Sequence, residues 1–131
     1  MTLFEIVGLY TALNLILAPI LMFRVGQARM KEKVSLGDGN NDFVLSRIRA
    51  HGNFIENAPL FLVGLLVLAG LSAVPVMLHI LGGAFTFGRV AHAHGMTGPN
   101  ALGKGRTIGT LLSVLSYFIM AFYILYLVLI G

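Results

Sequence analysis

The sequence predicts an all-α integral membrane fold, a bundle of four transmembrane helices that forms a single domain over residues 1–131, and three observations support it. Hydrophobic residues make up 57% of the chain and charged residues only 11%, whereas soluble domains have about 25% charged residues. The low charged fraction excludes a water-soluble globule. The high hydrophobic fraction excludes a disordered chain, because disorder needs low hydrophobicity. Long uncharged stretches cover residues 6–23, 57–88 and 107–131, and the basic residues gather in two segments between them.

The first helix is predicted over residues 3–23. A bilayer is crossed by about 20 mostly apolar residues, and the uncharged stretch that begins at Ile6 nearly fills that length. Thr2 and Glu5 have the spacing of a capping box, in which the two side chains accept hydrogen bonds from free amides at a helix start. We therefore expect Glu5 to cap this helix.

The second and third helices are predicted over residues 47–72 and 76–96. The uncharged stretch 57–88 is too long for one span and too short for two, so both helices must extend into the polar flanks. Ser72-Ala73-Val74-Pro75 interrupts it with a turn signal. The fourth helix is predicted over residues 106–130, after a turn at Gly98-Pro99-Asn100.

The distribution of positive charge predicts the topology. Six of the nine lysines and arginines lie between the first two helices or at their ends, and the other three flank the connection between the last two. With four spans, both groups fall on the same side, which the positive-inside rule places in the cytoplasm, with both termini opposite. This basic side is expected to attract anionic lipid headgroups or to bind a small anion. Nucleic acid is not expected, because the basic residues lie at membrane depth without interleaved aromatic residues.

Two apparent motifs fail, and cysteine is absent. Asp38-Gly39-Asn40-Asn41-Asp42 resembles the start of a calcium loop, but the glycine and glutamate that such a loop needs do not follow. Residues 98–104 match a phosphate loop until Gly105, which stands where a serine or threonine is required. Neither motif predicts a site, and no metal is expected.

Small residues are spaced for close helix packing in the second half of the chain. Ala91 and Gly95 are four residues apart, as are Gly105 and Gly109. Such spacing lets membrane helices approach closely. It predicts packing and indicates no function.

The second predicted helix carries a polar stripe. Arg49, Asn53, Glu56 and Leu60 are spaced by four, three and four residues, so they share one helix face. We expect Glu56 to lie well inside the bundle, where an ionisable residue usually has a partner. Two interpretations remain open: Glu56 belongs to a functional site, or it forms an ion pair with Arg49 or Arg89 that fixes helix register.

The stripe lies within a segment that resembles a known family. Residues 49–61 contain R-A-H-x-N-x-x-E followed by a proline, which resembles the signature of the MAPEG family of membrane-associated proteins in eicosanoid and glutathione metabolism. Residues 88–92, G-R-V-A-H, resemble the third-helix segment of the microsomal prostaglandin E synthase branch, and residues 26–29, G-Q-A-R, resemble the segment that closes the first helix there. Arg106 resembles the arginine that approaches the glutathione sulfur there, and the whole chain resembles the short bacterial branch of the family.

The resemblance implies a homotrimer that binds glutathione, its co-substrate, between neighbouring subunits near the cytoplasmic face of a bacterial inner membrane. Arg106 would be the catalytic residue, close to the thiol. The pocket would be shaped by six further residues carried over by position: Arg29, Arg49, Asn53, Glu56, Arg89 and His92. The implied activity is that of a glutathione-dependent transferase or peroxidase, which attacks a small lipophilic electrophile entering from the lipid.

The residue types suit this ligand. Glutathione carries two carboxylates and one ammonium, so its site should hold several guanidiniums, which bind carboxylates bidentately, and at least one acid. A nearby cation stabilises the nucleophilic thiolate. Three positions depart from the prostaglandin synthase pattern: Gly52 replaces an arginine, and Met96 and Thr110 replace tyrosines.

Two other functions are compatible with the composition. A small proton-coupled exporter would use Glu56 as its proton carrier, although such a protein needs polar access from both sides of the membrane. A non-catalytic membrane bundle would use the polar stripe only to fix helix packing.

Overall fold

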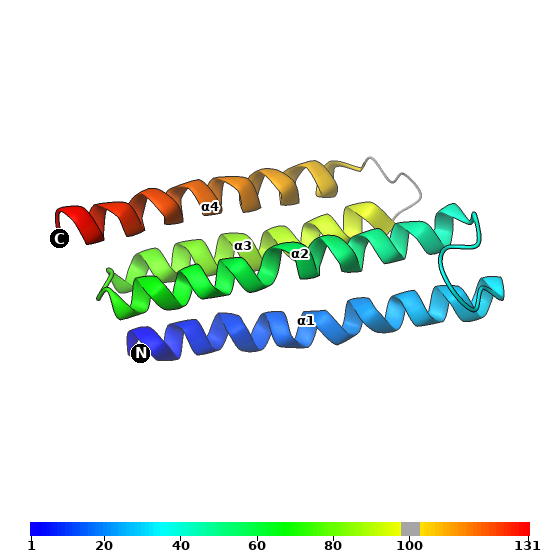
Figure 1. Cartoon of the computed structure of the whole chain (residues 1–131), viewed down its shortest axis with the longest axis horizontal. Coiled ribbons are helices and arrows are strands. Elements are labelled where there is room, and N and C mark those ends of the chain that lie inside the picture. Colours follow the sequence, from blue (N-terminus) through cyan, green and yellow to red (C-terminus); the bar gives the residue numbers. More distant parts are fainter. Residues whose placement is uncertain (98–102) are drawn as a thin grey trace.

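The computed structural model describes residues 1–97 and 103–131, and it consists of four long helices (Figure 1). They are α1 (Leu3–Glu32), α2 (Asp42–Gly70), α3 (Pro75–Thr97) and α4 (Lys104–Leu129). The described residues contain no strand. The predicted all-α class and the four helices are therefore confirmed, while the turn predicted at Gly98–Asn100 lies outside the described residues.

The helices run side by side, with α2 and α3 between α1 and α4 (Figure 1). Within the described residues α1 and α4 do not contact each other, and α4 packs mainly against α3. Both termini lie at the end of the bundle that holds the α2–α3 connection, and the α1–α2 connection lies at the opposite end, where α3 ends and α4 begins. We call this opposite end the basic end, because the arginines and lysines of the sequence gather towards it.

The chain is an integral membrane protein. Three described helices, α1, α2 and α4, are long and apolar enough to cross a membrane. Large apolar side chains such as Phe23, Phe118 and Phe122 lie exposed on the outside of the bundle, as expected where lipid replaces water. The remaining helix, α3, has 23 residues, and two of its basic residues, Arg89 and His92, are buried in the protein interior.

The helix bounds differ from the prediction mainly at the basic end. α1 continues to Glu32 instead of ending at residue 23, and α2 begins at Asp42 instead of residue 47. The uncharged stretch measures the apolar thickness of the membrane, whereas a helix continues until a backbone feature ends it. Lys33, with a left-handed φ of 58°, ends α1. Asn41 begins α2, because its side chain accepts hydrogen bonds from Phe43 N and Val44 N.

Two local predictions are confirmed. Thr2 and Glu5 form both hydrogen bonds of a capping box, at 3.2 and 2.8 Å. The chain reverses between α2 and α3 at residues 71–74, where Ser72 has a φ of 56°. The segment that resembled a calcium loop instead forms a turn, in which Asn40 N donates to Asp38 Oδ1, and then supplies the cap of α2.

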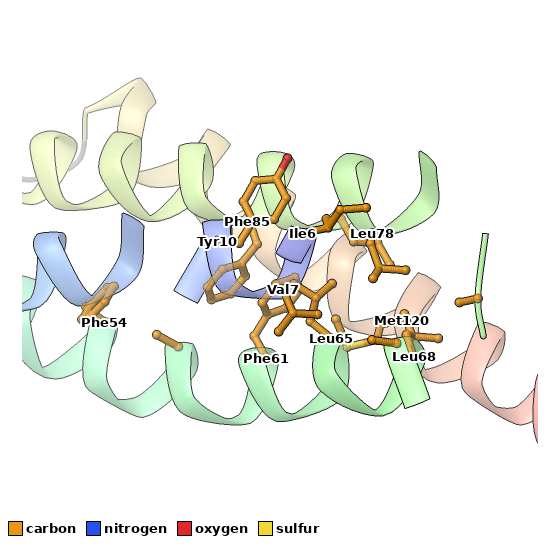
Figure 2. Packing of buried hydrophobic residues seen from close by; sticks show 14 of the residues in the cluster. Ile6, Val7, Tyr10, Phe54, Phe61, Leu65, Leu68, Leu78, Phe85 and Met120 are labelled. Atoms are coloured by element: carbon orange, nitrogen blue, oxygen red, sulfur yellow. The ribbon is translucent and has the colours of Figure 1, made fainter. Parts of the chain in front are cut away.

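The hydrophobic core lies among α1, α2 and α3, and Met120 of α4 closes it (Figure 2). Phe61 and Phe85 stack with ring centroids 3.8 Å apart, and Tyr117 meets both rings edge-on. The Tyr117 hydroxyl donates to the Asn57 carbonyl oxygen at 2.5 Å. These aromatic contacts fix the relative height of α2, α3 and α4.

A seam of small residues joins α3 to α4. A Cβ atom added at Gly105 would lie 2.7 Å from the Ala91 carbonyl oxygen, and one added at Gly109 would lie 2.6 Å from His92 N. A Cβ added at Gly95 would overlap the backbone of Arg106. The close approach predicted from the small-residue spacing is confirmed, and it brings the backbone of α4 within reach of polar side chains on α3.

Candidate functional site

The centre of the candidate site is the guanidinium of Arg89 on α3, which is only 3% exposed. One terminal nitrogen donates to Asn53 Oδ1 of α2 at 2.5 Å. The other donates to Ser113 Oγ at 2.5 Å and to the Gly109 carbonyl oxygen at 3.1 Å, both on α4. A single side chain therefore connects three helices near the basic end.

Neutral groups surround this buried charge. All three acceptors of Arg89 are uncharged, and its Nε has no hydrogen-bond partner within the described residues. The Phe85 ring, 5.5 Å from the guanidinium carbon, adds a cation–π contact. Because no carboxylate among residues 1–97 and 103–131 pairs with it, Arg89 leaves a positive potential in a low-dielectric setting, where it acts strongly on a nearby anion.

His92 lies less than one turn beyond Arg89 and is also buried, at 5% exposure. Its backbone and Cβ lie against Gly109 across the α3–α4 seam. The backbone of Arg106, at the start of α4, lies against Gly95 in the same seam. The seam thus brings the buried side chains of Arg89 and His92 close to the start of α4.

The position of Glu56 corrects our expectation that it lies well inside the bundle. Its side chain is 57% exposed on the outside of the chain, where it forms an ion pair with Arg49 at 3.7 Å. Glu56 and Arg49 are two helical turns apart, so they lie along one outer line of α2, whereas Asn53 is rotated towards Arg89. Of the two partners considered for Glu56, the structure shows Arg49.

Gly52 lies directly beside the ion pair between Arg49 and Glu56. A Cβ added at Gly52 would lie 3.8 Å from a terminal nitrogen of Arg49 and 3.9 Å from Glu56 Oε1. A long side chain at this position would compete with the Arg49–Glu56 contact for the same space. The departure from the family pattern at Gly52 is therefore linked to a pair of opposite charges that remains open to the outside.

Arg29 lies in a groove between α1 and α2. A hollow of about 370 Å³ at the basic end is lined by Arg29, Ile48 and His51, with residues of the α1 turns before Arg29. The Nε of Arg29 is buried without a hydrogen-bond partner in the described chain. At His51 the hollow meets a second one, of about 390 Å³, whose lining is almost wholly apolar and includes Phe54, Ile55 and Leu62.

Arg106 lies on α4, away from the α1–α2 groove that holds Arg29. It is exposed near the start of α4, where it lines an open hollow of about 410 Å³ with Thr107, Thr110, Leu111 and Val114. All these residues belong to α4, so the hollow is a surface of one helix. Since α1 and α4 do not contact each other, one chain does not bring Arg106 and Arg29 together.

The predicted site residues thus fall into groups. Asn53, Arg89 and His92 cluster where α2, α3 and α4 meet, and Arg49 with Glu56 lies on the outer line of α2. Sequence reasoning missed the Arg89 acceptors Gly109 and Ser113, and the groove residue His51. Hydroxyl residues within the apolar run of α4, and the histidine inside the R-A-H motif, are the signals that could have indicated them.

Comparison with known proteins gives a family match and two curated relatives. The model of the MAPEG family matches residues 7–126. Two curated relatives are both named "Inner membrane protein YecN", one from Escherichia coli strain K12 and one from Escherichia coli O6:H1 strain CFT073; each is 35% identical over 88 residues, or 67% of either chain. No solved structure matches the chain.

Proposed function

Because the chain belongs to the MAPEG family, we propose that it is a glutathione-dependent transferase or peroxidase of a bacterial inner membrane. The relatives named as inner membrane proteins support the location. The observation that carries the proposal is the exposed Arg49–Glu56 pair beside the uncompensated Arg89. Together they offer both signs of charge to a small zwitterionic peptide.

The chemistry follows from the charges. Arg29 and Arg49 would hold the two carboxylates of glutathione, and Glu56 would hold its ammonium. The positive potential of Arg89 and Arg106 would favour the thiolate over the thiol. The thiol first loses its proton to water. The thiolate sulfur then bonds to the electrophilic atom while the bond from that atom to its leaving group breaks, and the leaving group departs with the electron pair. With a peroxide the bond that breaks is O–O, and the released oxygen takes up a proton from water.

The separation of Arg29 from Arg106 supports a site shared between copies. A pocket that contains both residues must join the α1–α2 groove of one subunit to the α4 surface of the next. Such a contact is heterologous, because it uses two different surfaces, and copies joined this way form a ring when the rotation between neighbours closes. A homotrimer is our proposal for that ring.

The groove supports a lipophilic second substrate. Its half at the basic end holds Arg29 and His51, and its other half is lined by apolar side chains that face the lipid-exposed outside. A polar co-substrate at the basic end would lie directly beside an apolar molecule that enters from the bilayer. Proximity of this kind lowers the barrier of a two-substrate reaction.

The basic end is proposed to face the cytoplasm, where glutathione would reach it, with both termini on the opposite side. The exporter alternative has less support, because Glu56 lies on the outside of the chain and not in its interior. A proton carrier would need to exchange between the two faces of the bundle. The ion pair between Arg49 and Glu56 is the contact that a non-catalytic bundle would use, and measuring glutathione binding separates the two interpretations.

Calorimetric titration of the detergent-purified protein with glutathione tests the proposal. We expect saturable binding, weakened by about tenfold or more in Arg49→Ala and in Glu56→Ala, because each removes a charge-assisted contact. Lys104→Ala, which removes an exposed charge near Arg106, is the matched control and should bind normally. An ultraviolet thiolate signal should be lost in Arg106→Ala. Absence of binding at millimolar glutathione would contradict the proposal.

Mixing two defective subunits tests whether the site is shared. Arg29→Ala spoils the α1–α2 groove, and Arg106→Ala spoils the α4 surface. If the site lies between copies, a mixed ring contains an interface made of one intact groove and one intact α4 surface, so mixing restores the thiolate signal that neither variant shows alone. If each copy holds its own site, the mixture shows no thiolate signal.

A further inference from the structure

A further hollow lies at the basic end, on the face of α1 opposite the groove of Arg29. It measures about 160 Å³ and is lined by Arg24, Gln27, Ala28, Lys31, Phe43 and Arg47. The residues from α1 recur at the three- and four-residue spacing of one helix face. The groove of Arg29 uses the opposite face of α1, which holds Met22, Val25 and Gly26, so the two hollows are distinct.

Three cations converge on this hollow without an acid among them. Arg24 donates to Thr97 Oγ1 at 2.9 Å, and Arg47 donates to Ser46 Oγ at 3.1 Å. Lys31 and Arg47 both lie over the Phe43 ring, 4.8 and 4.4 Å from its centroid. None of the three forms an ion pair with a carboxylate in the described chain. Like charges gathered in this way repel each other unless an anion joins them.

The aromatic ring and the hydroxyl hold the cations in place. Phe43 carries Lys31 and Arg47 on its surface, and Thr97, at the end of α3, holds a terminal nitrogen of Arg24. Cations that are held in advance lose little side-chain freedom on binding, which favours affinity. This arrangement suits a single anion that accepts hydrogen bonds from all three cations.

We propose that this hollow binds a phosphate-type anion, held by Arg24, Lys31 and Arg47. Guanidiniums match phosphate oxygens bidentately, and an ammonium adds a point charge. A volume of about 160 Å³ is roughly ten times the minimum that one water molecule needs, so it accommodates a phosphate group.

The depth of the hollow suggests where the phosphate comes from. Arg24 directly follows the uncharged stretch that ends at Phe23, so the hollow lies at the level of lipid headgroups. A phospholipid headgroup and a free phosphate in solution share the chemistry that these residues recognise. The site does not depend on the glutathione proposal, because none of its three cations belongs to that pocket.

The test uses the delipidated full chain in detergent, with native mass spectrometry as the binding measurement. The probes are phosphatidylglycerol, phosphatidylcholine and inorganic phosphate. We expect saturable binding of phosphatidylglycerol, weakened by about tenfold or more in the double variant Arg24→Gln/Arg47→Gln, since each basic residue contributes about 1 kcal/mol towards an anionic headgroup. Lys31→Gln, which changes an exposed side chain, is a second variant for the case in which the double variant unfolds.

The matched control is Lys33→Asn/Lys104→Gln, which removes the same number of charges outside the hollow. Asparagine is chosen at Lys33 because it tolerates the left-handed φ there. Saturable binding of phosphate in place of the lipid supports the same site with a soluble ligand. The proposal is overturned if the control weakens binding as much as Arg24→Gln/Arg47→Gln, or if phosphatidylcholine binds as well as phosphatidylglycerol and phosphate does not bind.

Discussion

Arg89 of α3 and Asn53 of α2 are joined by a 2.5 Å hydrogen bond between a buried guanidinium and an amide oxygen. This bond is consistent with the rotation of α2 that buries Phe54 and Phe61 in the core. Because Asn53 turns towards the interior, Arg49 and Glu56, on the neighbouring line of the helix, are presented to the outside. A structural contact inside the chain thus sets the direction of a charged pair that we assign to ligand binding.

Asn53→Ala is expected to lower the free energy of unfolding by about 1–3 kcal/mol, because it leaves a buried charged donor without one acceptor. Asn53→Asp supplies an acceptor of opposite charge and should retain most of the stability. Thermal unfolding in detergent, followed by circular dichroism, measures both. A variant Asn53→Ala as stable as the parent would show that Arg89 does not need this bond.

Gly109→Ala should destabilise the protein strongly. The added methyl would meet His92 N at 2.6 Å and the Gly88 carbonyl oxygen even more closely, so α4 would have to move away from α3 and from Arg89. Gly8→Ala is the matched control, because nothing lies within 4 Å of its added Cβ. An exposed glycine within a helix costs about 1 kcal/mol relative to alanine, so this control should be equal to the parent or slightly more stable.

A charge exchange separates the two roles of the Arg49–Glu56 pair. Arg49→Glu/Glu56→Arg keeps an ion pair on the same line of α2, and exposed pairs contribute only about 0–1 kcal/mol to stability. The melting temperature should therefore hardly change, whereas calorimetric binding of glutathione should be lost, because its charged groups meet the wrong partners. Unchanged binding would mean that the pair fixes structure and does not contact the ligand.

The end of the bundle that holds the termini depends on Tyr10. Its hydroxyl donates to the His79 carbonyl oxygen at 3.1 Å and lies 3.1 Å from His79 Nδ1. Tyr10→Phe should lower the free energy of unfolding by about 1 kcal/mol. Tyr126→Phe, at an exposed position of α4, should have no effect in the same melting experiment.

The fold was largely predictable from the sequence, since the uncharged stretches, the turn before Pro75 and the cap at Thr2 all report local properties. The bounds at the basic end were not. Helices α1 and α2 extend into charged sequence there, and their ends depend on single residues such as Lys33 and Asn41. Hydropathy does not report those positions.

The site residues were predictable as a set, but not their arrangement. Spacing alone placed Arg49, Asn53 and Glu56 on one face. Which of them points inwards depends on the partner of each side chain. Of the three, Asn53 is the one that accepts a hydrogen bond from Arg89. The acceptors Gly109 and Ser113 could not be assigned from the sequence, because they reach Arg89 only through the close contact of two helices.

The seam of small residues between α3 and α4 also sets the orientation of the Arg106 side chain. Gly105, Gly109, Ser113 and Ser116 face inwards along α4, so the residues on its far side are turned towards the surroundings. Inserting one residue within the seam would rotate the part of α4 before the insertion by about 100° relative to the rest of the helix. Arg106 would then point away from its present neighbours although the residue itself is unchanged. Residues with small or no side chains thereby set the direction in which the long side chain of Arg106 points.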